Sequence, residues 1–431
     1  MKKLLFLLAL GTIVSSFMPL HAQLLKTLGD KAKAKVNQRT DKKVDDAMNK
    51  GLDGVEGKNK PRAKDENINE PPEKAAAGDS PVENEGLKAY SKFDFLPGEK
   101  VLAFENFENA AIGDFPERWN TNATAEVVTL NNRPGKWLKM NKEGVWFPEF
   151  ISSLPDNFTL EFDLGINKGF DASAFVLNIA NLKDKEKDYK DFYHYVTWRH
   201  GHALHMNFRP YNGRSHGSLR IVAGSDGNHS INNTIEYKGW DNNAAPFAHI
   251  SLWRQNQRLR VYLNAEKILD LPKAFAADGQ YNSVTMAMQG SNRPDDFYVV
   301  GNIRLATGKP DTRNKLISEG KFITTGITFD VNADNIKPSS YSVLKEIANA
   351  LTENPAVKIK ITGFTDSDGE SSKNIDLSKR RAAAVKAALV SEFTIDASRI
   401  ETTGLGAAKP VVENTSPENK AQNRRVEFVK L

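Results

Sequence analysis

The sequence predicts a multidomain protein in which an all-β sandwich is followed by an α+β domain with a mixed sheet and helices on one face. Three observations predict this arrangement. The chain has 431 residues, enough for two or three domains. Between residues 93 and 308, apolar and polar residues alternate over strand-length runs. From residue 326 onward, short apolar strands alternate with amphipathic helical stretches.

Composition narrows the function classes. With 39% hydrophobic and 26% charged residues, the chain is not a helical membrane protein beyond a single terminal segment. The net charge of +5 is spread along the chain, so no nucleic-acid partner is expected. The sequence has no cysteine, which excludes disulfides, cysteinyl zinc sites, thiol catalysis and a lipid-bearing cysteine.

The first 22 residues have the pattern of a secretory signal peptide. Lys2 and Lys3 precede an apolar run from Leu4 to Val14, and cleavage is expected after Ala22. The run is shorter than the ~20 residues that span a bilayer. An uncleaved membrane anchor is the alternative. The sequence therefore predicts an exported protein.

Residues 23–90 are predicted to form a stalk. Apolar residues recur at helical spacing from Leu25 to Val55, between many charged residues, which is typical of an amphipathic helix. This helix is expected to be solvated or to pair weakly, and the alternative is a helix on a membrane surface. From Glu56 to Glu85 the chain is polar and contains prolines, so disorder is expected.

Strand signals justify the sandwich at residues 93–308. Alternation is clear over 158–166 and 259–263, and a last strand is expected over 297–305. The segments LRVYLNAEKILDLP (259–272) and FYVVGNIRLA (297–306) resemble the concanavalin A-like and laminin-G-like jelly rolls. That resemblance implies a jelly-roll fold that binds a glycan. An outer-membrane β-barrel is the alternative, because alternating strands are typical of both.

The sandwich also carries weaker chemical signals. Laminarinase-type glycosidases of this fold class have a Glu-x-Asp-x-x-Glu strand motif, which Glu161 and Asp163 match until Ile166 replaces the third carboxylate. We therefore expect Glu161 and Asp163 on the solvent face of a strand, with a carbohydrate-active enzyme as a less favoured alternative. Two further groups are the histidines and the tryptophans. His200, His202 and His205 have metal-ligand spacing but are expected to be solvated on a loop, and Trp198, Trp240 and Trp253 suit a sugar platform but are more typical of a core.

The C-terminal elements follow in order. A short strand is expected over 327–330, and Pro338 opens a helix that ends at Asn354-Pro355. The apolar face of that helix is predicted as Tyr341, Leu344, Ile347, Ala348 and Leu351. A strand over 357–361, a helix with an apolar face from Leu377 to Leu389, a strand from Ile400 and a last strand over 425–431 complete a compact α+β domain.

Two segments carry the most specific signal. GFTDSDGESSKNIDLSKRRAAAV (363–385) and NKAQNRRVEF (419–428) closely resemble the OmpA-like peptidoglycan-binding domain, over roughly 326–431. Residues 329–332, FDVN, match the end of that family's first strand. Two departures stand out. Asn419-Lys420 replaces a frequent Gly-Arg, which could alter the final helix, and Phe364 stands where many members have His or Tyr.

The resemblance implies a ligand clamp formed by Asp366 and Arg381, fifteen residues apart. In the family, this pair holds one amino-acid centre of diaminopimelate in the peptidoglycan stem peptide. A carboxylate suits the ammonium of that centre, and a guanidinium grips its carboxylate. Asn332, Asn374 and Arg424 match family positions that line the pocket, and a helix N-terminus near 375–377 is expected to add positive potential. The alternative is an internal Asp366–Arg381 salt bridge without a ligand.

The sequence therefore predicts a non-enzymatic, periplasmic protein associated with the outer membrane of a Gram-negative envelope. Residues 320–431 are expected to bind peptidoglycan without a cofactor or metal. The sandwich is expected to bind a glycan or an outer-membrane protein.

Overall fold

The computed structural model describes residues 94–171, 174–193, 201–213, 216–264, 266–290, 293–308 and 311–431. The chain divides into two units, residues 1–87 and 88–431, and every described residue belongs to the second unit. The expected signal peptide and stalk, residues 1–90, lie outside the described residues. Among the described helices, none is long and apolar enough to cross a membrane.

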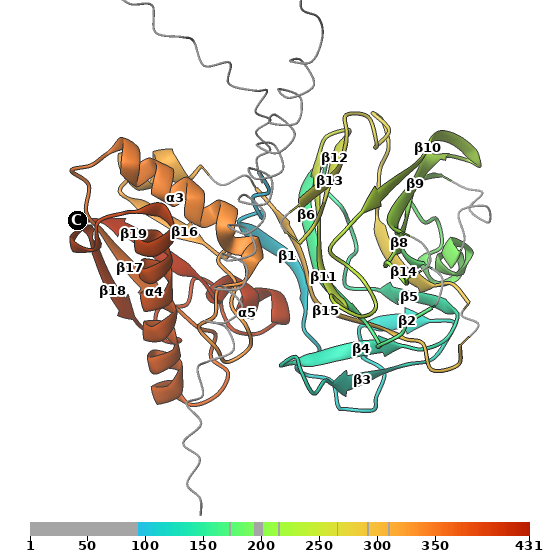
Figure 1. Ribbon diagram of the computed structural model, residues 1–431, viewed down its shortest axis with the longest axis horizontal. Coiled ribbons are helices and arrows are strands. Elements are labelled where there is room, and N and C mark those ends of the chain that lie inside the picture. Colours follow the sequence, from blue (N-terminus) through green and yellow to red (C-terminus); the bar gives the residue numbers. More distant parts are fainter. Residues whose placement is uncertain are drawn as a thin grey trace, which may run out of the picture. The chain divides into compact units, whose positions relative to one another are not determined.

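Two antiparallel sheets make up the middle region (Figure 1). In the first sheet the order is β13-β12-β11-β6-β15-β4-β3, and β1 pairs with β15. Its strands are β1 (Lys100–Glu105), β3 (Ala125–Thr129), β4 (Lys136–Met140), β6 (Asn157–Ile166), β11 (Phe247–Gln255), β12 (Arg258–Leu263), β13 (Glu266–Leu271) and β15 (Tyr298–Thr307).

The second sheet has the order β10-β9-β8-β7-β14-β5-β2. Its strands are β2 (Trp119–Thr121), β5 (Gly144–Pro148), β7 (Phe175–Ala180), β8 (His202–Arg209), β9 (Gly217–Ser225), β10 (Asn228–Tyr237) and β14 (Ser283–Met288). Two short helices, α2 (Lys185–Asp188) and η1 (Tyr189–Tyr193), follow β7. The strands expected around 158–166, 259–263 and 297–305 are all present, as β6, β12 and β15.

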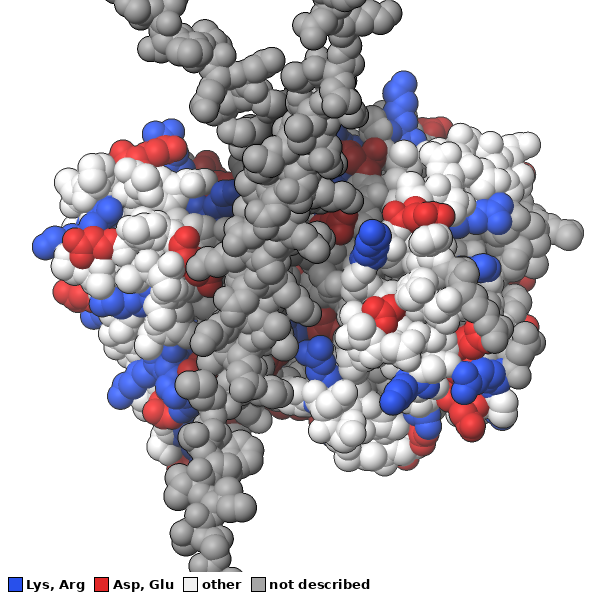
Figure 2. Space-filling model, in the orientation of Figure 1, with Lys and Arg blue, Asp and Glu red and all other residues white. Residues whose placement is uncertain are grey.

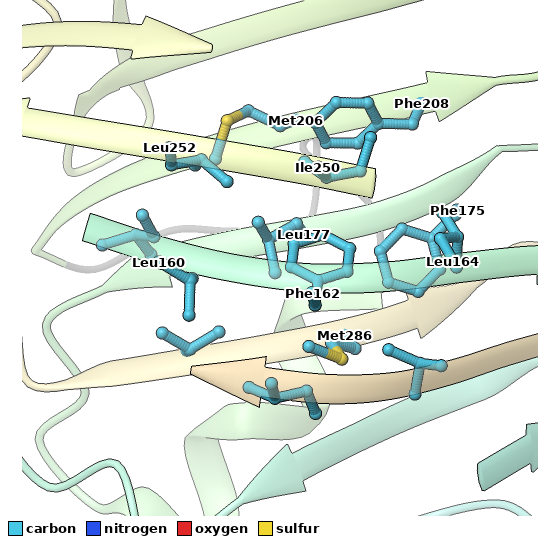
Figure 3. Packing of buried hydrophobic residues seen from close by; sticks show 14 of the residues in the cluster. Leu160, Phe162, Leu164, Phe175, Leu177, Met206, Phe208, Ile250, Leu252 and Met286 are labelled. Carbon is cyan, nitrogen blue, oxygen red and sulfur yellow. The ribbon is translucent and has the colours of Figure 1, made fainter. Parts of the chain in front are cut away.

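Apolar side chains from both sheets meet in one core (Figure 3). Leu160, Phe162 and Leu164 of β6 pack with Leu177 of β7 and Met286 of β14. Each fully buried side chain of this size contributes about 1.5–3 kcal/mol to folding. The described strands thus form two sheets with an apolar interior between them, rather than one closed sheet with a polar interior.

The C-terminal region has a mixed sheet in the order β16-β19-β17-β18, in which only β17 and β18 are parallel. The strands are β16 (Lys321–Thr324), β17 (Ile359–Gly363), β18 (Ile400–Gly404) and β19 (Val426–Lys430), and the helices are η2 (Asn314–Ser318), η3 (Pro338–Ser340), α3 (Tyr341–Glu353), α4 (Ser371–Phe393), η4 (Ala397–Arg399) and α5 (Pro417–Asn423). Figure 1 shows α3 and α4 side by side, and α4 packs on β17 and β18.

Two local expectations were wrong. The first strand of the C-terminal sheet is β16, and residues 327–330 lead into a turn in which only Phe329 bridges Ile336. Four residues are too few to show alternation, but Phe322 of β16 is buried beside Phe428 of β19 with ring centroids 6.1 Å apart. Tyr341 is 41% exposed and packs on Phe393, because it begins α3 and lies at the edge of that helix's buried face.

The C-terminal region contacts the sandwich along β1 and β15. The Gln422 side chain in α5 accepts a hydrogen bond from the Val101 amide at 2.9 Å. Arg118 pairs with Glu418 at 2.5 Å. The Arg304 guanidinium on β15 donates to the Thr325 hydroxyl at 2.8 Å. These contacts bring charged residues of both regions to one cavity.

Candidate ligand-binding site

A cavity of about 380 Å³ lies among these residues, within the size range of small-molecule sites. All five residues expected to bind ligand line it, namely Asp366, Arg381, Asn374, Asn332 and Arg424. The sandwich also contributes to its lining, through Phe104, Asn106, Glu108, Glu161, His249, Asn302 and Arg304.

Asp366 lies just past the end of β17, and its side chain is buried. Its carboxylate accepts a hydrogen bond from Arg424 Nη1 at 2.5 Å. The loop is held from α4, where Asn374 Nδ2 donates to the Asp368 carbonyl at 2.8 Å. Gly363 at the end of β17 lets α4 approach this strand closely, because a Cβ there would lie 2.3 Å from the Ser378 carbonyl oxygen. Asn374 therefore positions the Asp366 loop.

Arg381 lies on α4, two turns after Asn374, so both residues face the cavity. Its guanidinium donates to the carbonyls of Ala333 at 2.9 Å and Asp330 at 3.3 Å and stacks on Phe329. Burial, together with the charge of Arg424, lowers the pKa of Arg381 to about 10. The alternative of an internal Asp366–Arg381 salt bridge is wrong, because Asp366 pairs with Arg424 instead.

Arg424 is the second guanidinium of the site. Nη1 is bound to Asp366, while Nη2 is buried and has no hydrogen-bond partner among the described residues. The guanidinium lies 4.7 Å from the centre of the Phe104 ring. Asp366 thus pairs with Arg424, while Arg381 has no carboxylate partner and Arg424 Nη2 is a donor without a partner among the described residues.

The cavity is lined by charges of both signs, since Glu108, Asp330 and Asp368 also line it. On the face drawn in Figure 2, acidic and basic side chains are interspersed over the described surface. An anion is favoured at the cavity by the Arg424 Nη2 donor and by Arg381, which has no carboxylate partner among the described residues.

Asn332 is exposed in the turn between Phe329 and Ile336, with a φ of 54°. Asparagine tolerates this left-handed conformation better than most residues do. The turn's carbonyls at Asp330 and Ala333 bind Arg381, so the turn and α4 are held together. The FDVN segment thus lies in this turn, beyond the end of the first strand.

Two other expectations concern helices. The N-terminus of α4 lies at Ser371, one turn before the expected 375–377, because the helix starts directly after the Asp366 loop. The departure at Asn419-Lys420 leaves α5 intact, since Ser416 accepts a hydrogen bond from the Asn419 amide at 3.2 Å. Lys420 instead pairs with Asp368 at 2.7 Å and adds a tie to the Asp366 loop.

The sequence did not predict that residues of the sandwich line the cavity. Glu161 is buried and Asp163 half-buried, so the expected solvent face is wrong. Arg304 pairs with Glu161 at 3.0 Å. His249 Nδ1 lies 2.6 Å from Asp163, and Lys337 of the C-terminal region lies 3.1 Å from Asp163. The polar face of β6 is covered because the C-terminal region packs on it, which alternation alone does not reveal.

Both carboxylates and the histidine of this cluster are held in their charged forms. Burial would raise the pKa of Asp163, but the charge of Lys337 and the hydrogen bonds of His249 and Asn302 outweigh burial and lower it. Burial would lower the pKa of His249, but Asp163 and Glu161 raise it to about 9. His249 therefore lines the cavity as an imidazolium.

The histidine and tryptophan signals have structural explanations. His205 lies on β8 rather than on a loop and is buried, with Nδ1 2.6 Å from Asn178 Oδ1. His200 and Trp198 lie outside the described residues, and the described ones contain no group of side chains arranged to hold a metal. Trp240 is buried in the core, and Trp253 packs on Phe95 and under Arg260.

Comparisons with known proteins found similarity in the C-terminal region. A family model described as the OmpA family matches residues 328–424. The probable lipoprotein YiaD of Escherichia coli (strain K12) is 44% identical over 102 residues, which are 24% of this chain and 46% of that protein. The peptidoglycan-binding protein ArfA of Mycobacterium tuberculosis (strain H37Rv) is 37% identical over 103 residues, which are 24% of this chain and 31% of that protein.

Among solved structures, the peptidoglycan-associated lipoprotein from Burkholderia pseudomallei is 29% identical, with a TM-score of 0.24. The match covers 28% of this chain and 98% of that chain. The chain spans less than half the length of the two curated relatives. The family model that matches residues 328–424 shows an OmpA family domain in the C-terminal part of this chain.

Proposed function

We propose that the chain binds peptidoglycan non-covalently through residues 320–431, at the diaminopimelate of the stem peptide. Asp366 receives the ammonium of one amino-acid centre, and Arg381 with Arg424 receives its carboxylate. One observation carries the proposal: Arg424 Nη2 is buried without a partner among the described residues, beside a guanidinium that lacks a carboxylate partner there. The name of the relative ArfA describes it as peptidoglycan-binding, which supports the same ligand.

The proposed action is binding rather than cleavage. His249 is the histidine that lines the cavity, and its raised pKa keeps it protonated at neutral pH, so it cannot act as a general base. Glu161 and Asp163 each have cationic partners, so they are unsuited to the paired acid and base of a glycosidase.

We further propose that the protein is periplasmic and associated with the outer membrane. Its expected signal peptide would deliver it there, and residues 23–90 would link the wall-bound region to its N-terminal end. The jelly-roll interpretation of residues 93–308, with a glycan or outer-membrane protein as partner, belongs to the same proposal.

Sedimentation of the full chain with purified sacculi tests the binding site. Arg381→Ala and Asp366→Ala each remove one side of a desolvated charge interaction with the ligand. Such a loss costs about 2–5 kcal/mol, or roughly thirty- to several-thousand-fold in affinity. Sacculi with diaminopimelate should bind more tightly than sacculi with lysine, which lacks the second carboxylate.

The matched control is Arg258→Ala, which removes a guanidinium of the sandwich whose partner is Asp270 and which does not line the cavity. Wild type and Arg258→Ala should sediment alike. If Arg381→Ala and Asp366→Ala both sediment as wild type does, with unchanged circular dichroism, the proposed site is refuted.

A further inference from the structure

We propose that the sandwich supplies part of the ligand site, and that Phe104 is a positioning residue for Arg424. This inference rests on the proposed function, since it concerns how the same site grips a carboxylate. Phe104 and Arg424 both line the cavity, and the guanidinium lies 4.7 Å from the ring centre. The sandwich would thereby affect peptidoglycan affinity without belonging to the OmpA family domain.

Phe104 lies on the outer face of β1. Val101, Ala103 and Glu105 of β1 are buried, whereas Phe104 lies on the opposite face and is only half-buried. A large apolar ring on the outer face of a strand gains little from the sandwich core. Its contact with Arg424 gives that ring a role, because a guanidinium stacks favourably on an aromatic face.

Arg424 is restrained by contacts on two sides. Arg424 follows α5 and precedes β19, and Asp366 binds Nη1. The guanidinium carbon also lies over the Phe104 ring, 4.7 Å from its centre. The ion pair at one nitrogen and the ring contact together restrict the orientations of Nη2, the buried donor without a partner among the described residues. Restraining a donor before the ligand arrives lowers the entropy cost of binding.

The strand that carries Phe104, β1, is itself fixed against the C-terminal region. The Val101 amide donates to Gln422 in α5, two residues before Arg424. Beyond β1, the Phe107 amide donates to Glu105 Oε1 at 2.7 Å, and the Phe107 ring is buried against Trp119. Both ends of β1 are thus held, so the distance between Phe104 and Arg424 is set by the fold.

The chemical consequence is selectivity for a carboxylate. If Phe104 acts by orienting Arg424, its removal should weaken ligands that present a carboxylate to Arg424. It should leave unchanged the binding of a ligand that lacks that carboxylate. If Phe104 had only a structural role, its removal would weaken the binding of both ligands alike.

The experiment is calorimetric titration of the full chain with two soluble stem peptides, one carrying diaminopimelate and one carrying lysine at the same position. Phe104→Leu should lower the affinity for the diaminopimelate peptide by about three- to thirtyfold, the range of a desolvated cation–π contact. The affinity for the lysine peptide should change by less than about twofold. Phe104→Tyr keeps the aromatic face and should restore most of the affinity.

The matched control is Phe247→Leu, since Arg133 also lies 4.7 Å from that ring and Phe247 does not line the cavity. This variant should bind like wild type. Equal losses for both peptides in Phe104→Leu, or failure of Phe104→Tyr to rescue, would overturn the positioning role. If wild type binds the diaminopimelate peptide and Arg381→Ala does not, but Phe104→Leu matches wild type, only this inference fails. If wild type binds neither peptide, the proposed function fails as well.

Discussion

Two clusters of charged side chains line the same cavity, and they differ in how completely their charges are paired. On the sandwich side, Glu161 and Asp163 are matched by Arg304, His249 and Lys337. On the C-terminal side, Asp366 pairs with Arg424, whereas Arg381 is bound only to backbone carbonyls and a ring among the described residues. In the first cluster each charge has an oppositely charged partner within 4 Å, although the buried His249 Nε2 makes no hydrogen bond. In the second cluster, Arg381 has no oppositely charged partner among the described residues.

This difference separates a stabilising role from a binding role. Charges removed from water cost free energy unless partners in the protein compensate for the loss. In the paired cluster the protein itself provides those partners, so the cluster joins the two regions. In the unpaired cluster the compensation is incomplete, and an anionic ligand would complete it. Variants of the two clusters should therefore affect different measurements.

The largest expected effect on stability comes from the paired cluster. Arg304→Met leaves the Glu161 carboxylate without its arginine partner at a site where both side chains are only 7% exposed. Breaking a buried pair in this way typically costs about 3–5 kcal/mol of the free energy of unfolding. Urea denaturation of the full chain measures that loss.

Arg258→Met is the surface counterpart, since the Arg258 side chain is 42% exposed in its pair with Asp270. Its cost should stay below about 1 kcal/mol. Similar losses in Arg304→Met and Arg258→Met would contradict the distinction between the buried cluster and the surface.

The next effect is a dependence of stability on pH. The folded-state pKa of His249 is raised to about 9, from an ordinary value of 6.5. A group with a raised pKa stabilises the fold fully below about pH 6.5, and this contribution is lost as pH rises through about 9. A shift of this size corresponds to about 3 kcal/mol at most.

Urea midpoints measured from pH 6 to pH 9.5 should therefore decrease, and His249→Gln should flatten that decrease. Of the facing groups, the carboxylates Glu161 and Asp163 have lowered pKa values and stay charged over this range, and the cations Arg304 and Lys337 complete the cluster, so the change is expected at the imidazole. An equally steep decrease in His249→Gln would remove His249 as its cause.

The smallest effect on stability is expected in the unpaired cluster. Arg381→Met loses two hydrogen bonds to carbonyls but also relieves the desolvation of a guanidinium that has no carboxylate partner among the described residues. The free energy of unfolding should change by less than about 1 kcal/mol. A loss as large as that of Arg304→Met would show that Arg381 has a structural role after all.

The motif predicted which C-terminal residues lie together better than it predicted how they pair. Asp366, Arg381, Asn374, Asn332 and Arg424 do line one cavity, as the motif led us to expect. Which arginine pairs with Asp366 depends on the path of the chain between α5 and β19, and residue spacing contains no information on that path. Spacing made Arg381 the natural partner, whereas the fold brings Arg424 to Asp366.

In the sandwich, alternation predicted β6, because Leu160, Phe162 and Leu164 point to the core. The same alternation could not say what covers the other face of that strand. Polar residues on a half-buried strand suit water and a second folded region equally well. Glu161 and Asp163 were therefore assigned to solvent, although Lys337, more than 170 residues further along the chain, lies beside them.

The strand order of the C-terminal sheet bears on the timing of folding. β19 is the last strand along the chain, yet it lies between β16 and β17. Until residues 426–430 are available, β16 has no neighbour in this sheet, and β17 lacks the partner on one of its sides. Pairing of β16 with β19 also closes a loop of about a hundred residues, which slows folding. A ribosome stall or a protease cut shortly before Val426 would thus remove an interior strand and expose two sheet edges that can pair with other chains.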